Sequence, residues 1–213
     1  MMISPGTYYD EVKETGIDNL QKEIRRLKRL IARQKKEIED PRSEPETVCP
    51  SKSTVIYWSR EYLAMAKKAL AESGGKYKET KAERAEREFR DSLPRLRRLE
   101  LGIGGFFDGW EKYALEVDGD TLKRDTVMVI EGMDVSEVET REELLEYLRD
   151  MHLEEWRKNY SPERYGACIL DGTQWSLTLE YDDWKVREYN GDNVFPWNFE
   201  DLCVLFGAEW ERF

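Results

Sequence analysis

The sequence predicts an α+β protein, in which a helical hairpin or coiled-coil segment precedes an antiparallel sheet with helices on one face. Two observations predict this class. Apolar residues recur at helical spacing in the first 93 residues, and from residue 94 onward they alternate at strand spacing. We therefore expect a helical region over residues 1–93 and an acidic α+β domain over residues 94–213, with the element order β-β-β-α-β-β-α.

The clearest helical pattern lies between residues 17 and 39. Its apolar residues form an a/d seam over about three heptads, namely Ile17, Leu20, Ile24, Leu27, Ile31 and Ile38. The other faces are basic and include Arg25, Arg26, Arg29 and Arg33. A helix of this length is marginal alone, so we expect the seam to pack within the chain as a hairpin. The alternative is a homodimer through residues 17–38.

Two further helices are expected at about residues 54–73 and 80–92. Thr80 and Glu83 have the spacing of a capping box, which marks the start of the second of them. Residues 41–53 are rich in Pro, Ser and Glu, a composition typical of a linker. The first 93 residues therefore predict two or three helices with a long antiparallel pair as their core.

Alternating apolar residues predict five strands, at about residues 99–103, 113–117, 122–130, 175–181 and 184–189. Trp184 is expected to begin the last of these strands. A capping box at Thr140 opens a helix that we expect to reach Trp156, and Asn198 is expected to cap a final short helix.

The stretch GIGGFFDGW, residues 102–110, has the glycine spacing of a phosphate-binding loop. Such a loop needs Lys and then Ser or Thr directly after its last glycine, where this chain has Trp110 and Glu111, and Glu111 would repel phosphate. A dinucleotide fingerprint would need glycine in place of Phe107 and a helix afterwards, whereas a strand pattern follows. The stretch therefore predicts a hairpin whose glycines let the backbone turn.

The net charge of −11 is divided unevenly along the chain. Residues 1–100 contain 23 Lys and Arg against 18 Asp and Glu, and residues 101–213 contain 11 against 27. The acidic half is expected to repel nucleic acid and to favour basic partners. The sequence lacks an apolar run of about 18 residues that would span a membrane. Three unpaired cysteines and a start unlike a signal peptide predict a cytoplasmic protein.

Residues with metal-binding or nucleophilic chemistry are few. His152 has no second histidine, and we expect a packed or solvent-facing imidazole on a helix. Cys203 lies in an apolar run and predicts a buried, inert thiol, and Cys168 is expected in a strand core. We therefore expect no catalytic, cofactor-binding or metal-binding residue and no enzyme. The alternative is an acidic carboxylate or metal-dependent hydrolase, with the candidate residues Asp171, Glu180, Asp182 and Asp183.

Residues 171–207 contain the run DGTQWSLTLEY and, further on, YNGDNVFPWNFEDLCVLFG. This segment resembles the end of an uncharacterised domain of bacterial and mobile-element hypothetical proteins, in which W-x-L-x-I precedes a G-S-N-A-Y-P-x-N-F-like segment and a leucine helix. The G-G-F-x-x-G-W stretch resembles that domain's first hairpin. The likeness departs at Asp192, Val194 and Trp197. That domain has no assigned activity, so the resemblance implies a fold unit over about residues 94–207 and no catalytic residue.

The missing catalytic set, the uneven charge and the density of aromatic residues together predict a non-enzymatic protein-binding protein. Its most concrete form is a phage or mobile-element inhibitor of the anti-CRISPR kind, whose acidic surface occupies a basic nucleic-acid-binding site on its target. The candidate interaction residues are Phe106, Phe107, Trp110, Asp182, Asp183, Trp184, Asp192 and Trp197. The alternative is a nucleic-acid-associated protein that uses the basic helix 17–38.

Overall fold

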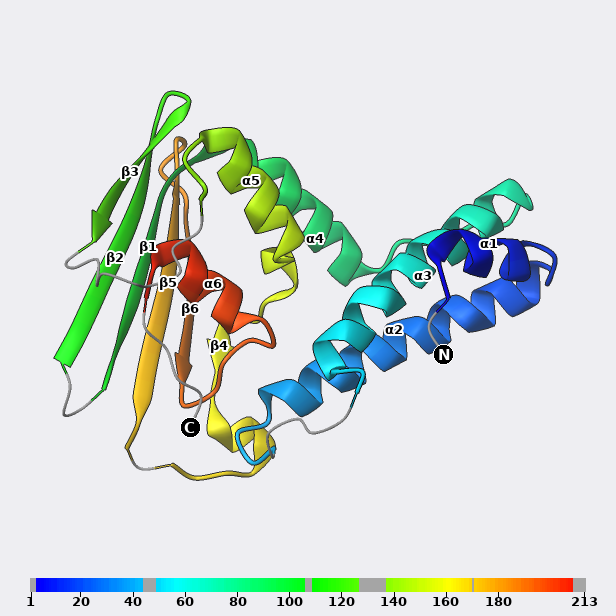
Figure 1. Ribbon diagram of the computed structural model, residues 1–213, viewed down its shortest axis with the longest axis horizontal. Coiled ribbons are helices and arrows are strands. Elements are labelled where there is room, and N and C mark those ends of the chain that lie inside the picture. The colour runs from blue at the N-terminus through cyan, green and yellow to red at the C-terminus, as the bar shows by residue number, and fades with distance from the viewer. Residues whose placement is uncertain (1–2, 44–48, 106–108, 127–136, 170, 209–213) are drawn as a thin grey trace. The chain divides into compact units, whose positions relative to one another are not determined.

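The computed structural model describes residues 3–43, 49–105, 109–126, 137–169 and 171–208. The chain divides into two compact units, Met1–Thr80 and Lys81–Phe213. Over the described residues it forms six α-helices and a six-stranded mixed sheet, which confirms the α+β class (Figure 1). None of the described helices is both long enough and apolar enough to cross a membrane.

The first unit consists of three helices, α1 (Pro5–Lys13), α2 (Ile17–Glu39) and α3 (Lys52–Glu72). The a/d seam of α2 packs within the chain against α3, where the small residues Ala66 and Ala69 are fully buried. Helix α1 adds Tyr8, whose ring stacks on Tyr62 with 4.3 Å between the centroids. Helix α1 was not predicted, because its nine residues contain no repeated apolar spacing.

Helix α4 (Lys81–Ser92) belongs to the second unit, so the units divide after Thr80 and not after residue 93 as the sequence predicted. Its one large apolar side chain, Phe89, is fully buried in the core of the sheet unit. The guanidinium of Arg187 lies over this ring, 4.5 Å from its centroid. Helical spacing does not tell which core a helix joins, and α4 was therefore grouped with the helices before it.

The sheet has the strand order β3-β2-β1-β5-β6-β4. Its strands are β1 (Leu96–Gly105), β2 (Gly109–Asp118), β3 (Thr121–Thr126), β4 (Asn159–Tyr160), β5 (Thr173–Tyr181) and β6 (Val186–Asp192). Neighbouring strands are antiparallel except β4, which pairs in parallel with β6. The wholly antiparallel sheet of the sequence prediction was therefore wrong in this detail, because a two-residue strand has no periodicity to detect. The predicted extension of the third strand to Ile130 lies outside the described residues.

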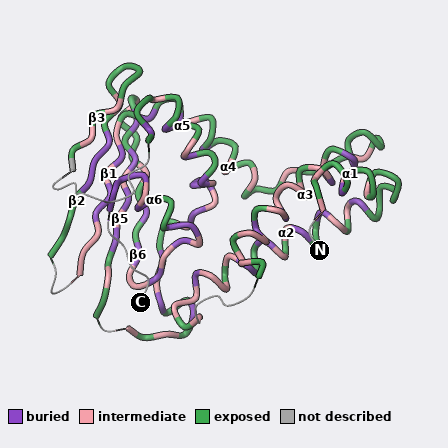
Figure 2. Tube along the Cα trace, viewed as in Figure 1, coloured by how far each residue is buried: buried purple, intermediate pink, exposed green. Residues whose placement is uncertain are grey.

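One face of the sheet packs against α4, α5 (Arg141–Asp150) and α6 (Phe199–Phe206) (Figure 1). The register aligns Leu115, Leu99 and Leu179 across three strands, and all three are fully buried. Arg98 and Glu100, which flank Leu99 along β1, lie on the opposite face, where they form an ion pair. Because side chains alternate along a strand, the sheet has one buried face and one polar face. Buried residues recur along the central strands in Figure 2.

The core beneath β5 and β6 is aromatic. Trp175 lies against Trp156 and Phe199, with 5.9 and 4.9 Å between the ring centroids. The indole Nε1 of Trp175 donates a hydrogen bond to the carbonyl oxygen of Val194 at 2.9 Å. A side chain at Gly191 would collide with this indole, so the close approach of β6 to Trp175 requires glycine there.

Two helix ends differ from the sequence prediction. Helix α5 ends at Asp150 and not near Trp156, because His152 has a left-handed backbone with φ 52° and a short 3-10 turn follows it. Asn198 does not cap α6 with its side chain. Its amide oxygen accepts a hydrogen bond from Nε1 of Trp156 at 2.9 Å, and its Nδ2 donates to the carbonyl oxygen of Met151. Asn198 therefore joins two core segments, a role that local spacing does not reveal.

Candidate protein-interaction site

The connection between β5 and β6 is a tight three-residue turn that ends at Trp184. The N–H of Tyr181 donates to the carbonyl oxygen of Lys185 at 3.0 Å, and the N–H of Trp184 donates to the carbonyl oxygen of Tyr181 at 3.2 Å. In hairpin loops of this length the last loop residue adopts a left-handed conformation, and Trp184 has φ 62°. The prediction that Trp184 lies in the return strand was wrong, because β6 begins two residues later.

Trp184 contributes little to this fold. The residue is 88% exposed, so its indole removes hardly any apolar surface from water. A left-handed conformation costs a residue with a Cβ about 1–2 kcal/mol, and glycine or asparagine is usual at such a position. Val186, the first residue of β6, is also 57% exposed. Residues 182–186, which comprise the turn and the start of β6, therefore expose apolar side chains, and we call them the hairpin-tip surface. At position 184, folding alone favours a small residue.

Asp183 holds the hairpin-tip surface in one shape. Its Oδ2 accepts from the Lys185 ammonium and from the Arg95 guanidinium, each at 2.7 Å. These cations, the lysine first, hold the pKa of the Asp183 carboxyl below its usual value. The backbone N–H of Asp182 also donates to the carbonyl oxygen of Arg95 at 2.9 Å. Trp184 is thus presented from a turn that is fastened to the segment before β1, which reduces the entropy lost on binding.

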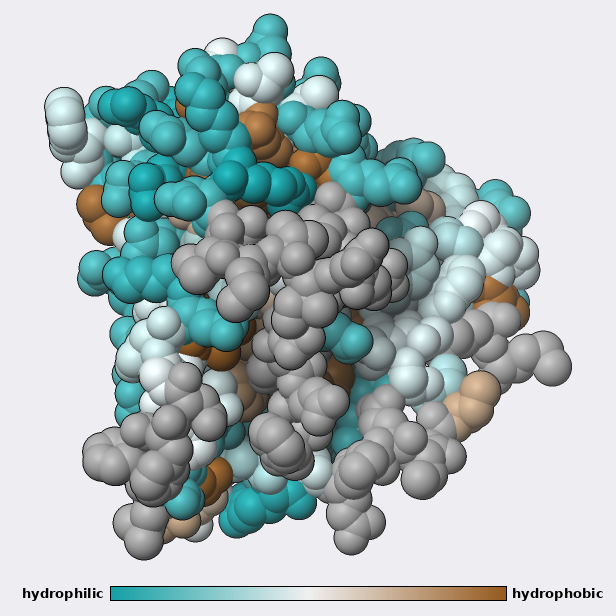
Figure 3. All heavy atoms as spheres, turned by 60° about the vertical axis from the view of Figure 1, so that its left-hand side comes forward, coloured by the Kyte–Doolittle hydropathy of each residue, from teal (hydrophilic) through white to brown (hydrophobic). Residues whose placement is uncertain are grey.

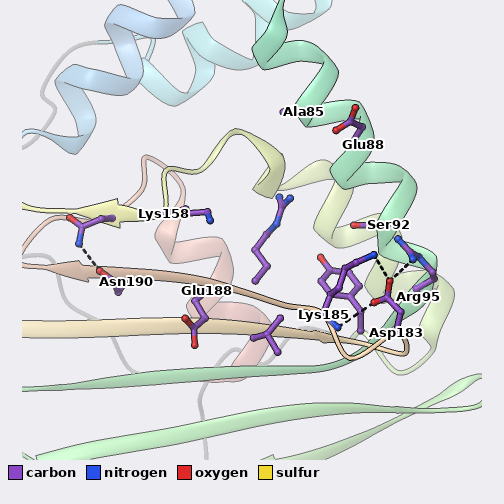
Figure 4. A pocket seen from close by; sticks show the side chains of 13 residues that line it. Ala85, Glu88, Ser92, Arg95, Lys158, Asp183, Lys185, Glu188 and Asn190 are labelled. Atoms are coloured by element: carbon purple, nitrogen blue, oxygen red, sulfur yellow. Dashed lines mark hydrogen bonds and ion pairs between the residues drawn. The ribbon is translucent and has the colours of Figure 1, made fainter.

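A pocket of about 540 Å³ lies between α4 and β6 (Figure 4). In the close-up Glu88 comes from α4 and Glu188 from β6, Lys158 and Asn190 lie at one end, and Asp183 with its two cations lies at the other. This volume is typical of ligand-binding pockets. Among the residues that the structure describes, the side chains of Glu88, Lys158 and Glu188 make no ion pair or hydrogen bond. The pocket was not predicted from the sequence, because α4 was assigned to the other unit.

Trp110 is a second exposed aromatic residue, 51% exposed, on the polar face of the sheet. A Cβ at Gly102 would lie 3.3 Å from its ring, so the indole rests above that glycine. Hydrophilic side chains prevail in the view of Figure 3, and hydrophobic residues form small separate groups. Trp110 aligns with Gly104 and Gln174 at the start of β5, whereas the hairpin tip follows the end of β5. The two tryptophans are therefore about 20 Å apart along the strands.

The remaining predicted interaction residues do not gather at the hairpin tip. Asp192 aligns with Gln174, at the end of the sheet where Trp110 lies, and it accepts a hydrogen bond from Nδ2 of Asn193 at 2.7 Å. Trp197 is half-buried in the segment before α6. Phe106 and Phe107 lie outside the described residues. Of the six that the structure describes, it brings together Asp182, Asp183 and Trp184.

The basic residues of α2 lie opposite its apolar seam. Lys22, Arg25, Arg29, Arg33 and Lys36 are exposed and recur every three or four residues, and we call this row the α2 stripe. Arg33 is also paired with Glu37. Arg26 is exposed as well, but its guanidinium makes two 2.7 Å hydrogen bonds to Glu23. The stripe places five cations on one side of the helix.

His152, Glu154 and Glu155 bring three possible metal ligands within 4.8 Å of one another. The guanidinium of Arg90, from α4, already occupies this group. Its Nε donates to Oε1 of Glu154 at 2.7 Å, and its Nη2 lies 3.1 Å from Nδ1 of His152. A divalent cation bound to the same oxygen would be repelled by the positive charge of Arg90. The geometry therefore fits an ion pair that ties α4 to the segment after α5 better than it fits a metal centre.

Glu154 is ionised in this arrangement although its side chain is fully buried. Burial raises the pKa of its carboxyl, whereas hydrogen bonds from His152 and Arg90 and the charge of Arg90 lower this pKa. The lowering is the larger effect, so the pKa of Glu154 lies below its ordinary value. Arg90 is more than 60 positions away from His152 and Glu154 in the chain, so neither helical nor strand spacing indicated the cluster.

The cysteines and the carboxylates considered for a hydrolase do not gather at one place, because Asp171 lies at the opposite end of β5 from the other three carboxylates. Cys203 is buried, which confirms its predicted burial, and burial raises the pKa of its thiol, as expected of an inert thiol. Cys168 is exposed and lies outside the strands, so its predicted place in a strand core was wrong; β5 begins only at Thr173. Asp171 precedes β5, whereas Glu180 lies near its end and Asp182 and Asp183 in the turn that follows.

No protein-family model, no curated protein and no solved structure matches this chain. The resemblance of residues 171–207 to a bacterial domain therefore stays a prediction, and the functional argument depends on the residues themselves.

Proposed function

We propose that this chain is a non-enzymatic protein-binding protein whose main contact is the hairpin-tip surface, residues 182–186. The observation that carries the proposal is Trp184, which is 88% exposed at φ 62° in a turn that Asp183 fixes. Strained residues cluster at functional sites, and tryptophan is enriched among the residues that dominate binding energy. An exposed indole on a strained backbone that Asp183 fixes is the arrangement expected of a binding anchor.

The charge of the second unit supports a basic partner. Of the 34 basic and 45 acidic residues of the chain, 18 and 32 lie in residues 81–213. A surface of this sign accelerates encounter with a positively charged protein and makes the association sensitive to salt. An inhibitor of the anti-CRISPR kind, which occupies a basic nucleic-acid-binding site on its target, would have a surface of this charge. That identity of the chain stays a prediction.

Trp184→Asn is expected to raise the free energy of unfolding by about 1 kcal/mol, because asparagine tolerates the left-handed conformation and the indole is already exposed. Urea denaturation of the two proteins, followed by circular dichroism, measures the difference. A loss of stability of similar size would show that Trp184 supports the fold, and would remove the argument for a binding anchor.

The same variant tests binding. The wild-type chain is used to retain binding proteins from an extract of the source cells, and each retained protein is purified and titrated with both chains. Its affinity for Trp184→Asn is expected to be at least tenfold lower than for the wild type, a change typical of binding hot spots. Trp110→Thr is the matched control, because it removes an exposed tryptophan at the other end of the sheet. Equal affinities of all three proteins would contradict the proposal.

A second candidate function, nucleic-acid association, is favoured by the α2 stripe. Five exposed cations along one side of a helix match the repeated charge of a phosphate backbone. For a fluorescent 20-nucleotide single strand, the slope of log affinity against log salt is expected to become shallower by about 1.4 in the double variant Arg25→Gln, Arg29→Gln, since each phosphate contact contributes about 0.7. Lys76→Gln, an exposed lysine outside the stripe, is the control. An unchanged slope, or no binding at low salt, would reject this candidate.

A further inference from the structure

One edge of β6 is open over its first half. Strand β4 pairs with β6 only at Asn190 and Gly191. The N–H of Asn190 donates outward to the carbonyl oxygen of Lys158 at 3.0 Å. Because peptide groups alternate along a strand, Glu188 and Val186 also direct their N–H and C=O groups away from β5. No strand among the described residues pairs with these groups.

This open edge forms one wall of the pocket described above, and α4 forms the wall opposite (Figure 4). The unpaired part of β6, from Val186 to Glu188, is about 10 Å long, which is the length of a three-residue strand. A free strand edge beside a pocket of about 540 Å³ offers both backbone hydrogen bonds and room for side chains. Such an edge is a template for one more strand.

The charges around the edge indicate what kind of strand fits. Strand β4 begins at Asn159 and runs parallel to β6, so a strand that lies in line with β4 and runs the same way ends beside Lys158. The Lys158 ammonium has no partner among the described residues and matches a terminal carboxylate. Glu188 is exposed, has no partner among the described residues, and lies on the face of β6 away from α4, where it matches a basic side chain on the same face of an added strand.

We propose that the edge of β6 between Val186 and Glu188 binds the C-terminal end of a partner protein as an added parallel strand, with its free carboxylate at Lys158 and a basic side chain beside Glu188. This inference rests on the proposed protein-binding function and names the chemistry of the partner segment. The backbone of Glu188 supplies hydrogen bonds to any extended sequence, and the charged residues select its end and its basic position.

The test uses the full chain and the fluorescein-labelled peptide Thr-Val-Lys-Val, as the free acid and as the C-terminal amide. The acid is expected to bind, and the amide and the Lys158→Met variant are each expected to weaken binding about tenfold through loss of a charge-assisted contact. Amide hydrogen exchange at Val186 and Glu188 is expected to slow when the acid is added. Equal affinity for the acid and the amide, or unchanged exchange at both residues, would overturn the proposal.

Two variants at one position isolate the backbone contact. Glu188→Pro removes the outward N–H but no hydrogen bond to β5, and edge strands tolerate proline at such positions. Glu188→Thr also removes the charge but keeps the N–H. The proline variant is expected to bind at least tenfold more weakly than the threonine variant, in line with a buried hydrogen bond left unmade. Equal affinities would contradict strand addition. If the proline variant does not fold, Lys158→Met and the exchange measurement still decide the question.

Trp184→Asn separates this inference from the proposed function. The variant is expected to bind the peptide as the wild type does, because Trp184 does not line the pocket. If a partner binds in a Trp184-dependent way and the peptide does not bind, the strand site alone is rejected. Peptide binding without any Trp184-dependent partner would reject the hairpin-tip surface alone.

Discussion

Arg90→Met is expected to lower the free energy of unfolding at pH 7 by about 3 kcal/mol, which is the lower end of the range for a broken buried ion pair. The lower end applies because the Arg90 side chain is 46% exposed, whereas that of Glu154 is fully buried. The variant leaves the carboxylate of Glu154 without its cation in a place where water cannot replace it. Urea denaturation followed by tryptophan fluorescence reports on this unit, since six of the seven tryptophans lie after residue 80.

Glu154→Gln is the matched variant, and its expected loss is smaller, about 1–2 kcal/mol, because the Arg90 charge that remains is half-exposed to water. The folded-state pKa of Glu154 lies below its ordinary value of 4.5, so the ionised carboxylate stabilises the fold above pH 4.5. This contribution is lost as the pH falls through the lower, folded-state pKa. The difference between the wild type and Glu154→Gln should therefore shrink as the pH falls below 4.5.

Two outcomes would contradict this account of the Arg90 cluster. Equal losses in the two variants would mean that the burial of Glu154 does not matter. A zinc-dependent rise in the melting temperature of the wild type would mean that His152, Glu154 and Glu155 hold a metal in spite of Arg90, because ligand binding to the folded state raises stability. We expect zinc to leave the melting temperature unchanged.

The elements that the sequence predicted are those with a repeated apolar spacing. Helix α2 and the central strands β1, β2 and β5 have such spacing, because each buries several residues on one side. Strand β4 has two residues and α1 has nine, too few to repeat a pattern. Spacing also does not report which core an element joins, and for this reason α4, with Phe89 as its one large apolar residue, was assigned to the wrong unit.

The candidate site was predicted only in part, for a different physical reason. A tryptophan in a segment of alternating apolar residues is usually buried in the core, so the sequence pattern does not predict that Trp184 is exposed. Its exposure results from the turn that Asp183 fixes. The pocket and the Arg90–Glu154 pair join residues that are distant in sequence. Val186 and Tyr189 were expected in one alternating strand, but they are three residues apart and therefore lie on opposite faces of β6.

Gly191→Ala is the second change with a large expected effect. An added Cβ would overlap Nε1 of Trp175 and lie 2.6 Å from the carbonyl oxygen of Val194, the two atoms joined by the core hydrogen bond. Both residues are 1% exposed, so neither can move aside without opening the aromatic core. Overpacking costs about 1–3 kcal/mol and a lost hydrogen bond about 1 kcal/mol. We expect the free energy of unfolding to fall by about 3 kcal/mol.

Gly102→Ala is the control, because that glycine also lies within a strand of the same sheet. Its Cβ would meet the Ser176 hydroxyl at 2.9 Å and the Trp110 ring at 3.3 Å, and the half-exposed indole can shift. We expect a change below 1 kcal/mol. A near-ultraviolet circular dichroism signal that is reduced in Gly191→Ala and retained in Gly102→Ala would locate the damage at Trp175. Similar losses in both variants would show that glycine matters to the strand backbone in general. The expected contrast depends on whether the atoms that a Cβ would meet are able to move. The number of glycines in residues 102–110 does not reveal this.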